Sequence, residues 1–229
     1  MFDLDGTLLP MDEDRFTKYY FGLLCKRMAK FGFEPKKLVD TIWAGTGAMY
    51  KNDGSRSNED AFWELFEKVY DVPKSKYLDE FRDFYADEFN QAIVATEPTP
   101  LARQILDECH RKGLKTYLAT NPIFPVEGTG NRIRWAGMTN DDFLDITTYE
   151  NSTFSKPNPL YYKEIADRNG IVASEAIMIG NDSTEDLAAK DIGMSTFLVT
   201  DCLMNKGKRI DDADYRGSLA DVLQFIREL

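Results

Sequence analysis

The sequence predicts an α/β fold: an open parallel Rossmann-like sheet flanked by helices, with an inserted all-helical cap subdomain. Two patterns indicate this fold. Residues 12–95 carry apolar residues at helical spacing and contain no convincing strand. After residue 96, helices alternate with short apolar strands, a pattern typical of a parallel sheet covered on both faces. We therefore expect a discontinuous core, residues 1–11 and 96–229, and a helical cap, residues 12–95.

Composition narrows the class of protein. The 229 residues are 43% hydrophobic, enough for a core with an inserted subdomain. The 28 basic and 39 acidic residues give a net charge of −11, which argues against binding to nucleic acid or to an anionic membrane. No apolar run approaches the ~18 residues of a membrane span. The chain is expected to be a monomer or a weak homodimer.

The cysteines and the single histidine exclude several kinds of site. Cys25, Cys109 and Cys202 have spacings that suit neither a disulfide framework nor a zinc site, which predicts a reducing, cytoplasmic setting. His110 is the only histidine, so a Ser-His-Asp triad and a histidine-rich metal site are both excluded. We expect His110 to be a surface residue near a helix end.

Four helices are predicted in the cap. They cover residues 12–31, 34–43, a stretch that begins at Ser57, and 78–89. Gly32 is expected to end the first helix, and the Ala-Gly-Thr-Gly run at residues 44–47 is expected to break the second. Ser57 is expected to cap the third.

Strands and helices alternate in the predicted core. The expected strands are residues 1–9, 115–119, 143–148, 176–179 and 196–199. The expected helices are residues 101–112, a short stretch near 133–135, 159–169, 185–191, and a final amphipathic helix capped by Ser218. The glycines at residues 128–130 predict a loop.

Two carboxylates at the start of the chain form the first motif. Asp3 and Asp5 are two residues apart, so in an extended chain they point to the same side. Gly6 and Thr7 then predict a sharp turn that brings backbone N–H groups close to a bound anion. Only two residues precede Asp3, which is short for a buried central strand, and we therefore expect the natural chain to have residues upstream of Met1.

Two further motifs follow in the core. An apolar strand ends at Thr120 and Asn121, where parallel sheets bind their ligands. Lys156 directly precedes Pro157, which fixes the local backbone and favours an extended lysine that points inward.

The last motif is acidic. The apolar strand at residues 177–179 ends in Gly180, and Asp182 and Asp186 follow four residues apart. Together, in this order, the four motifs resemble those of the haloacid dehalogenase-like hydrolases, most of which are phosphatases. The resemblance extends over the whole chain, because that family also inserts a helical cap after its first strand.

The resemblance implies a Mg²⁺ site, since a hard cation prefers oxygen ligands. Its ligands would be the Asp3 carboxylate, the Asp5 backbone carbonyl and Asp182. Asp186 would either hold a metal-bound water or orient Lys156.

The resemblance also implies roles for the remaining motif residues. Thr120 would bind a phosphoryl oxygen, Asn121 would help to position the substrate, and Lys156 would offset negative charge. Asp3 would attack phosphorus, while Asp5 would protonate the leaving oxygen and then take a proton from water.

We therefore predict a Mg²⁺-dependent phosphatase that hydrolyses a small phosphorylated metabolite through an aspartyl-phosphate. The alternatives are a phosphoglucomutase-like phosphotransferase and a non-catalytic phosphate-binding or regulatory protein on the same fold. Asp5 argues against dehalogenation, because no leaving oxygen needs a proton in that reaction. Substrate choice is expected to lie in the cap, and the candidate contacts are Arg15, Lys18, Lys51 and Arg56.

Overall fold

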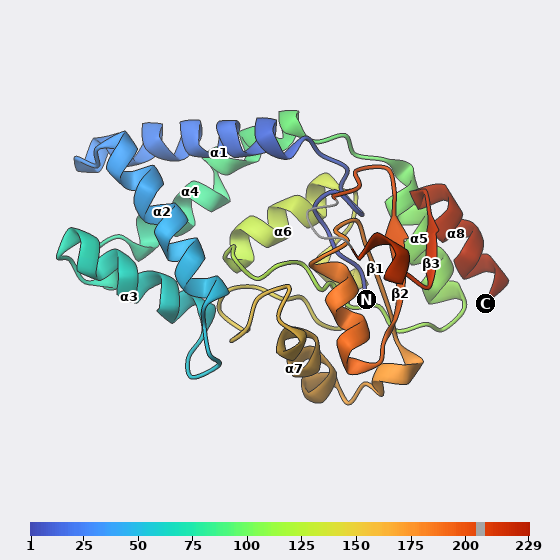
Figure 1. The fold of residues 1–229 in the computed structure, drawn as a ribbon. Helices are drawn as coiled ribbons and strands as arrows, with labels where there is room; N and C mark the ends of the chain where they lie inside the picture. The colour runs from blue at the N-terminus through green and yellow to red at the C-terminus, as the bar shows by residue number, and fades with distance from the viewer. Residues whose placement is uncertain (205–208) are drawn as a thin grey trace.

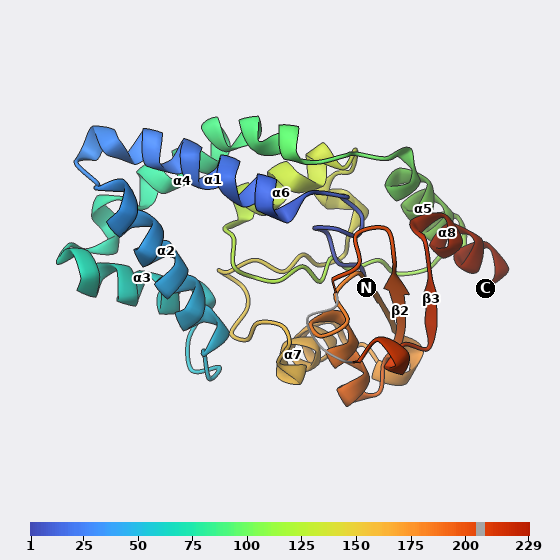
Figure 2. The same cartoon turned by 45° about the horizontal axis from the view of Figure 1, so that its top comes forward.

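A computed structural model describes residues 1–204 and 209–229. The cap helices gather at one end of the molecule and the sheet lies at the other, as both views show (Figures 1 and 2). Met11 and Thr96 lie at the two boundaries between the predicted core and the predicted cap, and they form an antiparallel bridge. Beside this bridge, the Asp12 N–H donates to the Ala95 carbonyl over 3.2 Å. The chain therefore leaves and re-enters the sheet region at one place.

The cap is helical throughout. Its elements are α1 (Glu13–Met28), η1 (Ala29–Phe31), α2 (Pro35–Tyr50), α3 (Asn58–Tyr70), η2 (Lys74–Lys76), α4 (Leu78–Ala86) and η3 (Glu88–Ala95). Two predicted signals are confirmed. Ser57 caps α3 by accepting a hydrogen bond from the Asp60 N–H over 3.0 Å. Gly32 ends the first helical stretch in the left-handed conformation, with φ of 83°.

The predicted break at residues 44–47 is wrong, because α2 runs through it without interruption. The reason is tertiary packing. Gly45 is buried, and a Cβ atom there would lie 2.5 Å from Phe62 Cδ2 of α3. The missing side chain lets the two helices approach closely. Packing of this kind outweighs the ~1 kcal/mol by which glycine disfavours a helix.

In residues 1–204 and 209–229, three parallel strands form the regular part of the sheet: β1 (Ile177–Gly180), β2 (Ser195–Val199) and β3 (Tyr215–Gly217). β2 lies between the other two, with Ile179 opposite Phe197 and Leu198 opposite Arg216. The sequence predicts β1 and β2 but not β3, which has only three residues, Tyr215 and Arg216 being exposed, and carries no strand pattern.

The other three predicted strands extend the sheet beyond β1 through single parallel bridges. Phe2 bridges Ile179 on one side and Leu118 on the other, and Leu118 bridges Ile146. Residues 1–9, 115–119 and 143–148 thus lie side by side in that order, but they pair more briefly than strands of this length would. The prediction that residues precede Met1 in the natural chain stays a prediction.

Helices flank this sheet. They are α5 (Pro100–Arg111), α6 (Val126–Trp135), α7 (Pro159–Asn169) and α8 (Leu219–Glu228), with short 3₁₀ turns at η4 (Asn140–Asp142), η5 (Ala173–Glu175), η6 (Asp186–Ile192) and η7 (Ile210–Asp212). One expectation is wrong: the glycines at 128–130 lie inside α6 rather than in a loop. The helix predicted at residues 185–191 is present as the 3₁₀ helix η6. A Cβ at Gly128 would lie 2.9 Å from Tyr85 Cδ1, so cap packing again explains a glycine within a helix.

Ser218 caps α8 as predicted, through a capping box with Asp221. His110 lies exposed in the last turn of α5, as expected. All three cysteines are free. None of the helices in residues 1–204 and 209–229 has the length and apolar character needed to cross a membrane.

Candidate active site

A buried lysine joins two of the predicted motifs. Lys156, which precedes α7, donates from Nζ to Asp3 Oδ1 over 2.8 Å and to Asp186 Oδ1 over 2.6 Å. Its side chain is 1% exposed. Residues far apart in the sequence therefore meet at the carboxyl ends of the strands, where α/β sheets bind ligands.

Burial and charge set the protonation of this group. Burial raises the pKa of Asp3 and raises the pKa of Asp186 to about 6, while Lys156 lowers both. Burial alone would lower the pKa of Lys156, but the carboxylates of Asp186 and Asp3 raise it well above its ordinary value. Lys156 is therefore a fixed positive charge between two carboxylates.

A buried arginine holds Asp5. Arg132 of α6 donates from Nη1 to Asp5 Oδ2, and its guanidinium lies over the Phe124 ring, 4.2 Å from the centroid. The Arg132 side chain is 1% exposed. Burial raises the pKa of Asp5, and Arg132 partly opposes that rise. Asp5 Oδ1 is buried and has no hydrogen-bond partner among the described residues, so one oxygen stays available for proton transfer.

The sequence reasoning did not identify Arg132. Arg132 comes shortly after residues 128–130, which the sequence predicts as a loop. No regular spacing relates it to Asp5, which lies 127 positions earlier in the chain. The only available signal was its place beside Ile133, at the start of the predicted short helical stretch.

Asn181 links the first turn to the segment after β1. Its Oδ1 accepts from the Thr7 hydroxyl over 2.9 Å, and its Nδ2 donates to the Cys202 carbonyl over 2.7 Å. Gly6, with φ of +81°, lies against the Asn181 amide, where a Cβ atom would overlap it. The glycine predicted to make the turn thus also makes room for Asn181, a residue to which the sequence analysis assigned no role.

The acidic motif after β1 folds back on itself. Asp182 Oδ1 accepts from the N–H groups of Thr184 and Glu185, over 2.7 and 3.0 Å. Asp186 Oδ2 accepts from the Asp182 N–H over 2.9 Å. Gly180 has no Cβ, which leaves space for the Asp186 carboxylate. This arrangement directs one Asp186 oxygen to the backbone and the other to Lys156.

The donor set suits a hard divalent cation in its chemistry. Asp3, Asp5 and Asp182 all line one cavity and offer oxygen atoms, the ligands that Mg²⁺ prefers. In the described residues, no group of three or more carboxylate, histidine or cysteine side chains is arranged to hold a metal. In this structure the carboxylates of Asp3, Asp5 and Asp182 contact Lys156, Arg132 and backbone N–H groups, respectively.

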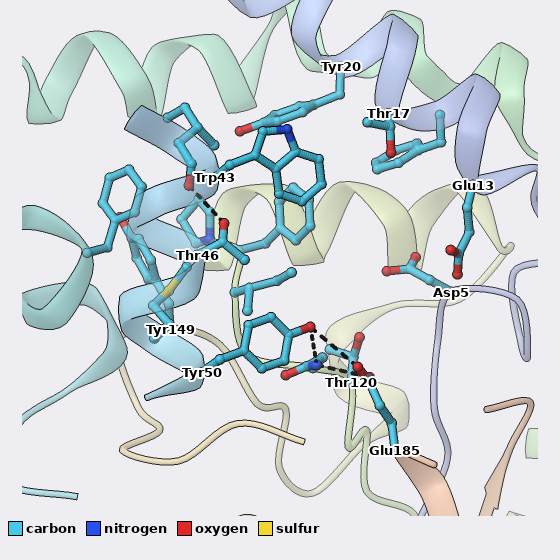
Figure 3. A pocket seen from close by; sticks show the side chains of 18 of the residues that line it. Asp5, Glu13, Thr17, Tyr20, Trp43, Thr46, Tyr50, Thr120, Tyr149 and Glu185 are labelled. Carbon is cyan, nitrogen blue, oxygen red and sulfur yellow. Dashed lines mark hydrogen bonds between the residues drawn. The ribbon is translucent and has the colours of Figure 1, made fainter. Parts of the chain in front are cut away.

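Two predicted phosphate-binding residues face the same cavity. Thr120 is buried and lines it, as does Asn121. Asn121 Nδ2 donates to Glu185 Oε2 over 2.9 Å and to the hydroxyl of Tyr50 over 3.0 Å, and that hydroxyl donates to Glu185 Oε1 over 3.3 Å. Burial raises the pKa of Glu185 to about 7. Tyr50 belongs to α2, so this contact joins cap and core (Figure 3).

The cavity lies between the cap and the carboxyl ends of the strands, and its volume is about 290 Å³. Tyr20 and Trp43 border it from the cap, across from Asp5 (Figure 3). In the part of the chain that the structure describes, the predicted cap contacts are not among its lining residues: Arg15, Lys18, Lys51 and Arg56 are all exposed elsewhere. Arg82 of α4 lines the cavity instead.

Comparison with known proteins identifies the family. Residues 1–193 match the family model described as haloacid dehalogenase-like hydrolase. The chain belongs to the haloacid dehalogenase-like hydrolases. The predicted family, fold class and enzyme class are thereby confirmed, since a hydrolase is an enzyme.

Individual relatives agree with this assignment. The chain is 28% identical over 199 residues to a phosphoglycolate phosphatase from Vibrio parahaemolyticus, covering 87% of this chain and 82% of that protein. Its fold is similar to that of a haloacid dehalogenase-like phosphatase from Thermococcus onnurineus, with a TM-score of 0.58, 20% identity, and coverage of 98% and 95%. It is also similar to a 2-haloacid dehalogenase from Pseudomonas syringae, with a TM-score of 0.61, 18% identity, and coverage of 99% and 96%. The two structures establish the fold alone, whereas the curated relative supports the phosphatase branch.

Proposed function

We propose that this haloacid dehalogenase-like hydrolase is a Mg²⁺-dependent phosphatase that acts on a small phosphorylated metabolite through an aspartyl-phosphate. The observation that carries the proposal is the buried Lys156, which bonds to Asp3 and Asp186, two carboxylates that line one cavity together with Asp5. A nucleophilic carboxylate, an acid and a fixed cation are the groups that phosphoryl transfer needs. The phosphatase names of the curated relatives support the same activity.

The proposed metal ligands are the Asp3 carboxylate, the Asp5 backbone carbonyl and Asp182. Bound there, Mg²⁺ would supply positive charge close to the transferring phosphoryl group. Asp186 Oδ1 accepts a hydrogen bond from Lys156 Nζ. Of the two roles considered for Asp186, this contact favours the orientation of Lys156 over the binding of a metal-bound water.

In the first proposed step, an Asp3 carboxylate oxygen attacks phosphorus as the bond from phosphorus to the ester oxygen breaks. Asp5 gives its proton to that leaving oxygen. Its raised pKa supports this role, because a carboxyl group must keep its proton to act as an acid near neutral pH.

In the second proposed step, Asp5 takes a proton from water. The hydroxide so formed attacks phosphorus, phosphate is released and the Asp3 carboxylate is restored. Thr120 and Lys156 would hold the phosphoryl oxygens. Asn121 would position the substrate indirectly, since its amide nitrogen already contacts Tyr50 and Glu185.

The division into a cap of residues 12–95 and a core of residues 1–11 and 96–229 belongs to the same proposal. The pairing of Met11 with Thr96 supports it. A cytoplasmic setting is supported by the three free cysteines. A monomer or weak homodimer is proposed from the sequence alone.

The decisive experiment measures phosphate release from p-nitrophenyl phosphate with and without Mg²⁺. We expect turnover only with the metal, and none in Asp3→Asn. Product analysis with a sugar phosphate separates the alternatives, because a phosphotransferase returns a phosphorylated product rather than free phosphate. Metal-independent turnover, or full activity in Asp3→Asn, would contradict the proposal.

A further inference from the structure

The wall of the cavity opposite the carboxylates is built of aromatic side chains. α1 and α2 contribute Tyr20 and Trp43, the cap also contributes Phe62 and Tyr85, and Phe124 closes the side next to Asp5. Their rings lie close together: Tyr20 and Phe124 have centroids 5.7 Å apart in an edge-to-face arrangement. Such a wall favours a flat or apolar ligand group, which it can contact with rings on several sides.

Exposed aromatic rings at this wall need an explanation. Trp43 is 54% exposed and Tyr50 is 41% exposed, and both line the cavity. An exposed large aromatic side chain that borders a cavity leaves apolar surface in contact with water, and a ligand that covers it recovers that free energy. The volume of about 290 Å³ is close to the lower end of ligand pockets, which begin at ~300 Å³. A leaving group of two carbons would leave much of this space unfilled.

The charges of the cavity agree with an uncharged leaving group. Arg82 is the one basic side chain among the described residues that line the cavity. Its Nε lies 3.7 Å from Glu127 Oε1. Lys156 and Arg132 are already paired with carboxylates at the phosphoryl end. The cap wall thus presents few groups that would attract the carboxylate of a phosphoglycolate-like substrate.

We infer that the substrate is a phosphate monoester whose leaving group carries an uncharged aromatic ring or a comparable flat apolar group, held against the wall that Tyr20, Trp43 and Phe124 form. This inference rests on the proposed phosphatase activity and names its substrate class. The ring would pack on the cap while the phosphate faces Asp3.

The test compares phenethyl phosphate with ethyl phosphate and phosphoglycolate, in the presence of Mg²⁺. Phenethyl and ethyl alcohol are similar leaving groups, so the ratio of their kcat/KM values reports on the ring and not on chemical reactivity. A hydrophobic pocket discriminates ~10–200-fold for a single methylene. We expect phenethyl phosphate to exceed both other esters at least about tenfold. Equal kcat/KM values for phenethyl and ethyl phosphate, or a preference for phosphoglycolate, would overturn the inference.

Substitutions in α2 test where the aromatic ring of the substrate binds. Trp43→Ala should reduce the phenethyl-to-ethyl ratio of kcat/KM severalfold, and Thr46→Trp, which fills the cavity from the same helix, should also reduce it. Two matched controls alter similar exposed positions that are not among the described lining residues: Tyr19→Ala and Ala44→Trp should keep the wild-type ratio. An unchanged ratio in both Trp43→Ala and Thr46→Trp would overturn the assignment of the ring to this wall.

Binding separates the inference from the activity on which it rests. Calorimetry with phenethylphosphonate and ethylphosphonate, which have no ester bond to hydrolyse, should show tighter binding of the aromatic compound. If no ester is hydrolysed but the aromatic phosphonate binds more tightly, the phosphatase proposal fails and the aromatic pocket stands. If both phosphonates bind equally, the pocket assignment fails whatever the activity.

Discussion

At the scale of single residues, Asp5 combines two features that a leaving-group acid needs. Its pKa is raised by burial, and its Oδ1 has no partner in the described part of the chain. The other oxygen is held by Arg132, which fixes the direction of the carboxyl group. Asp3, by contrast, accepts a hydrogen bond from Lys156, and we propose it as the nucleophile. The two carboxylates of one short motif thus lie in different surroundings, which is how one site assigns different roles to the same chemical group.

We predict that Asp5→Asn lowers turnover by roughly 10²–10⁴-fold, the usual contribution of general acid–base help. The loss should be smaller for esters with good leaving groups, because these need little protonation. The measurement is a series of aryl phosphates of graded leaving-group pKa, run on wild type, Asp5→Asn and Asp3→Asn. Asp3→Asn serves as the contrast and should lose activity for every ester. An equal loss across the series for Asp5→Asn would falsify its role as an acid.

A second prediction concerns the pair of Asp5 and Arg132. When Asp5 is ionised, it forms an ion pair with Arg132; the Arg132 side chain is 1% exposed and that of Asp5 is 26% exposed, so removal of one charge leaves the other at least partly buried without its partner. Breaking such a pair from one side costs about 3 kcal/mol of unfolding free energy. Arg132→Gln should therefore destabilise the protein strongly in urea unfolding, and Asp5→Asn added to it should restore part of the loss. If the double variant is no more stable than Arg132→Gln alone, the two charges are not coupled.

At the scale of elements, the helices of the cap are set by contacts with each other as much as by local propensity. Gly45 and Gly47 both lie in α2, yet only Gly45 faces a neighbouring helix. The ends of helices, in contrast, follow local rules: Ser57 and Ser218 cap α3 and α8 as the sequence predicts.

The two glycines provide a matched pair of substitutions. Gly45→Ala should destabilise the protein by ~1–3 kcal/mol, because the new Cβ would meet the Phe62 ring at 2.5 Å. Gly47→Ala meets nothing within 4 Å and should stabilise it by about 0.4–1 kcal/mol, since alanine loses less backbone entropy on folding. Thermal melting of both variants tests this. Similar shifts in Tm for the two would show that α2 does not pack on α3 through Gly45.

Where α5 meets η4, the Asp142 carboxylate is expected to contribute a pH-dependent part of the unfolding free energy. Burial would raise the pKa of Asp142, but Arg103 and the Thr139 N–H lower it below its ordinary value, with hydrogen bonds of 2.7 Å each. A carboxylate with a lowered folded pKa stabilises the protein above its unfolded pKa, 3.8, and this stability is lost as the pH falls through the folded value.

Asp142→Asn should therefore lower the unfolding free energy by about 1 kcal/mol at pH 7, the net contribution of a typical intramolecular hydrogen bond. The difference from wild type should shrink as the pH falls below ~4. Urea unfolding across this range measures it, with Asp141→Asn, an exposed neighbour, as the control. A difference that stays constant with pH would mean that the charge of Asp142 does not contribute.

At the scale of the whole molecule, the site exists only where the cap meets the sheet. The cavity has its carboxylates on one side and its aromatic wall on the other. The contact of Tyr50 with Asn121 and Glu185 is a polar link across this boundary. We expect it to help to hold the cap over a bound substrate.

Tyr50→Phe removes the hydroxyl of this link and keeps the ring. A hydrogen bond contributes ~0.5–1.5 kcal/mol, so KM should rise severalfold while Tm changes little, because Tyr50 is an exposed residue. Steady-state kinetics and melting curves test this, with Tyr19→Phe, an exposed cap tyrosine, as the control. A KM equal to that of wild type would show that the link does not affect substrate binding.

The family, the fold class and the order of the motifs could all be predicted from the amino-acid sequence. Strand and helix periodicity, and helix caps such as Ser218, are local properties that neighbouring residues fix. The predicted residues Asp3, Lys156 and Asp186 could be found because the carboxyl ends of parallel strands meet at one edge of a sheet. Their assigned catalytic and metal-binding roles remain proposals.

The contacts between residues far apart in the chain became visible only in the folded structure. Arg132 reaches Asp5 only because α6 packs under the cap, and Gly45 and Gly128 stay helical only because Phe62 and Tyr85 occupy the space beside them. The aromatic wall likewise combines side chains from separate helices. Contacts between residues far apart in the chain leave no periodic trace in the sequence, so only the folded chain reveals which side chains share the cavity with the two aspartates.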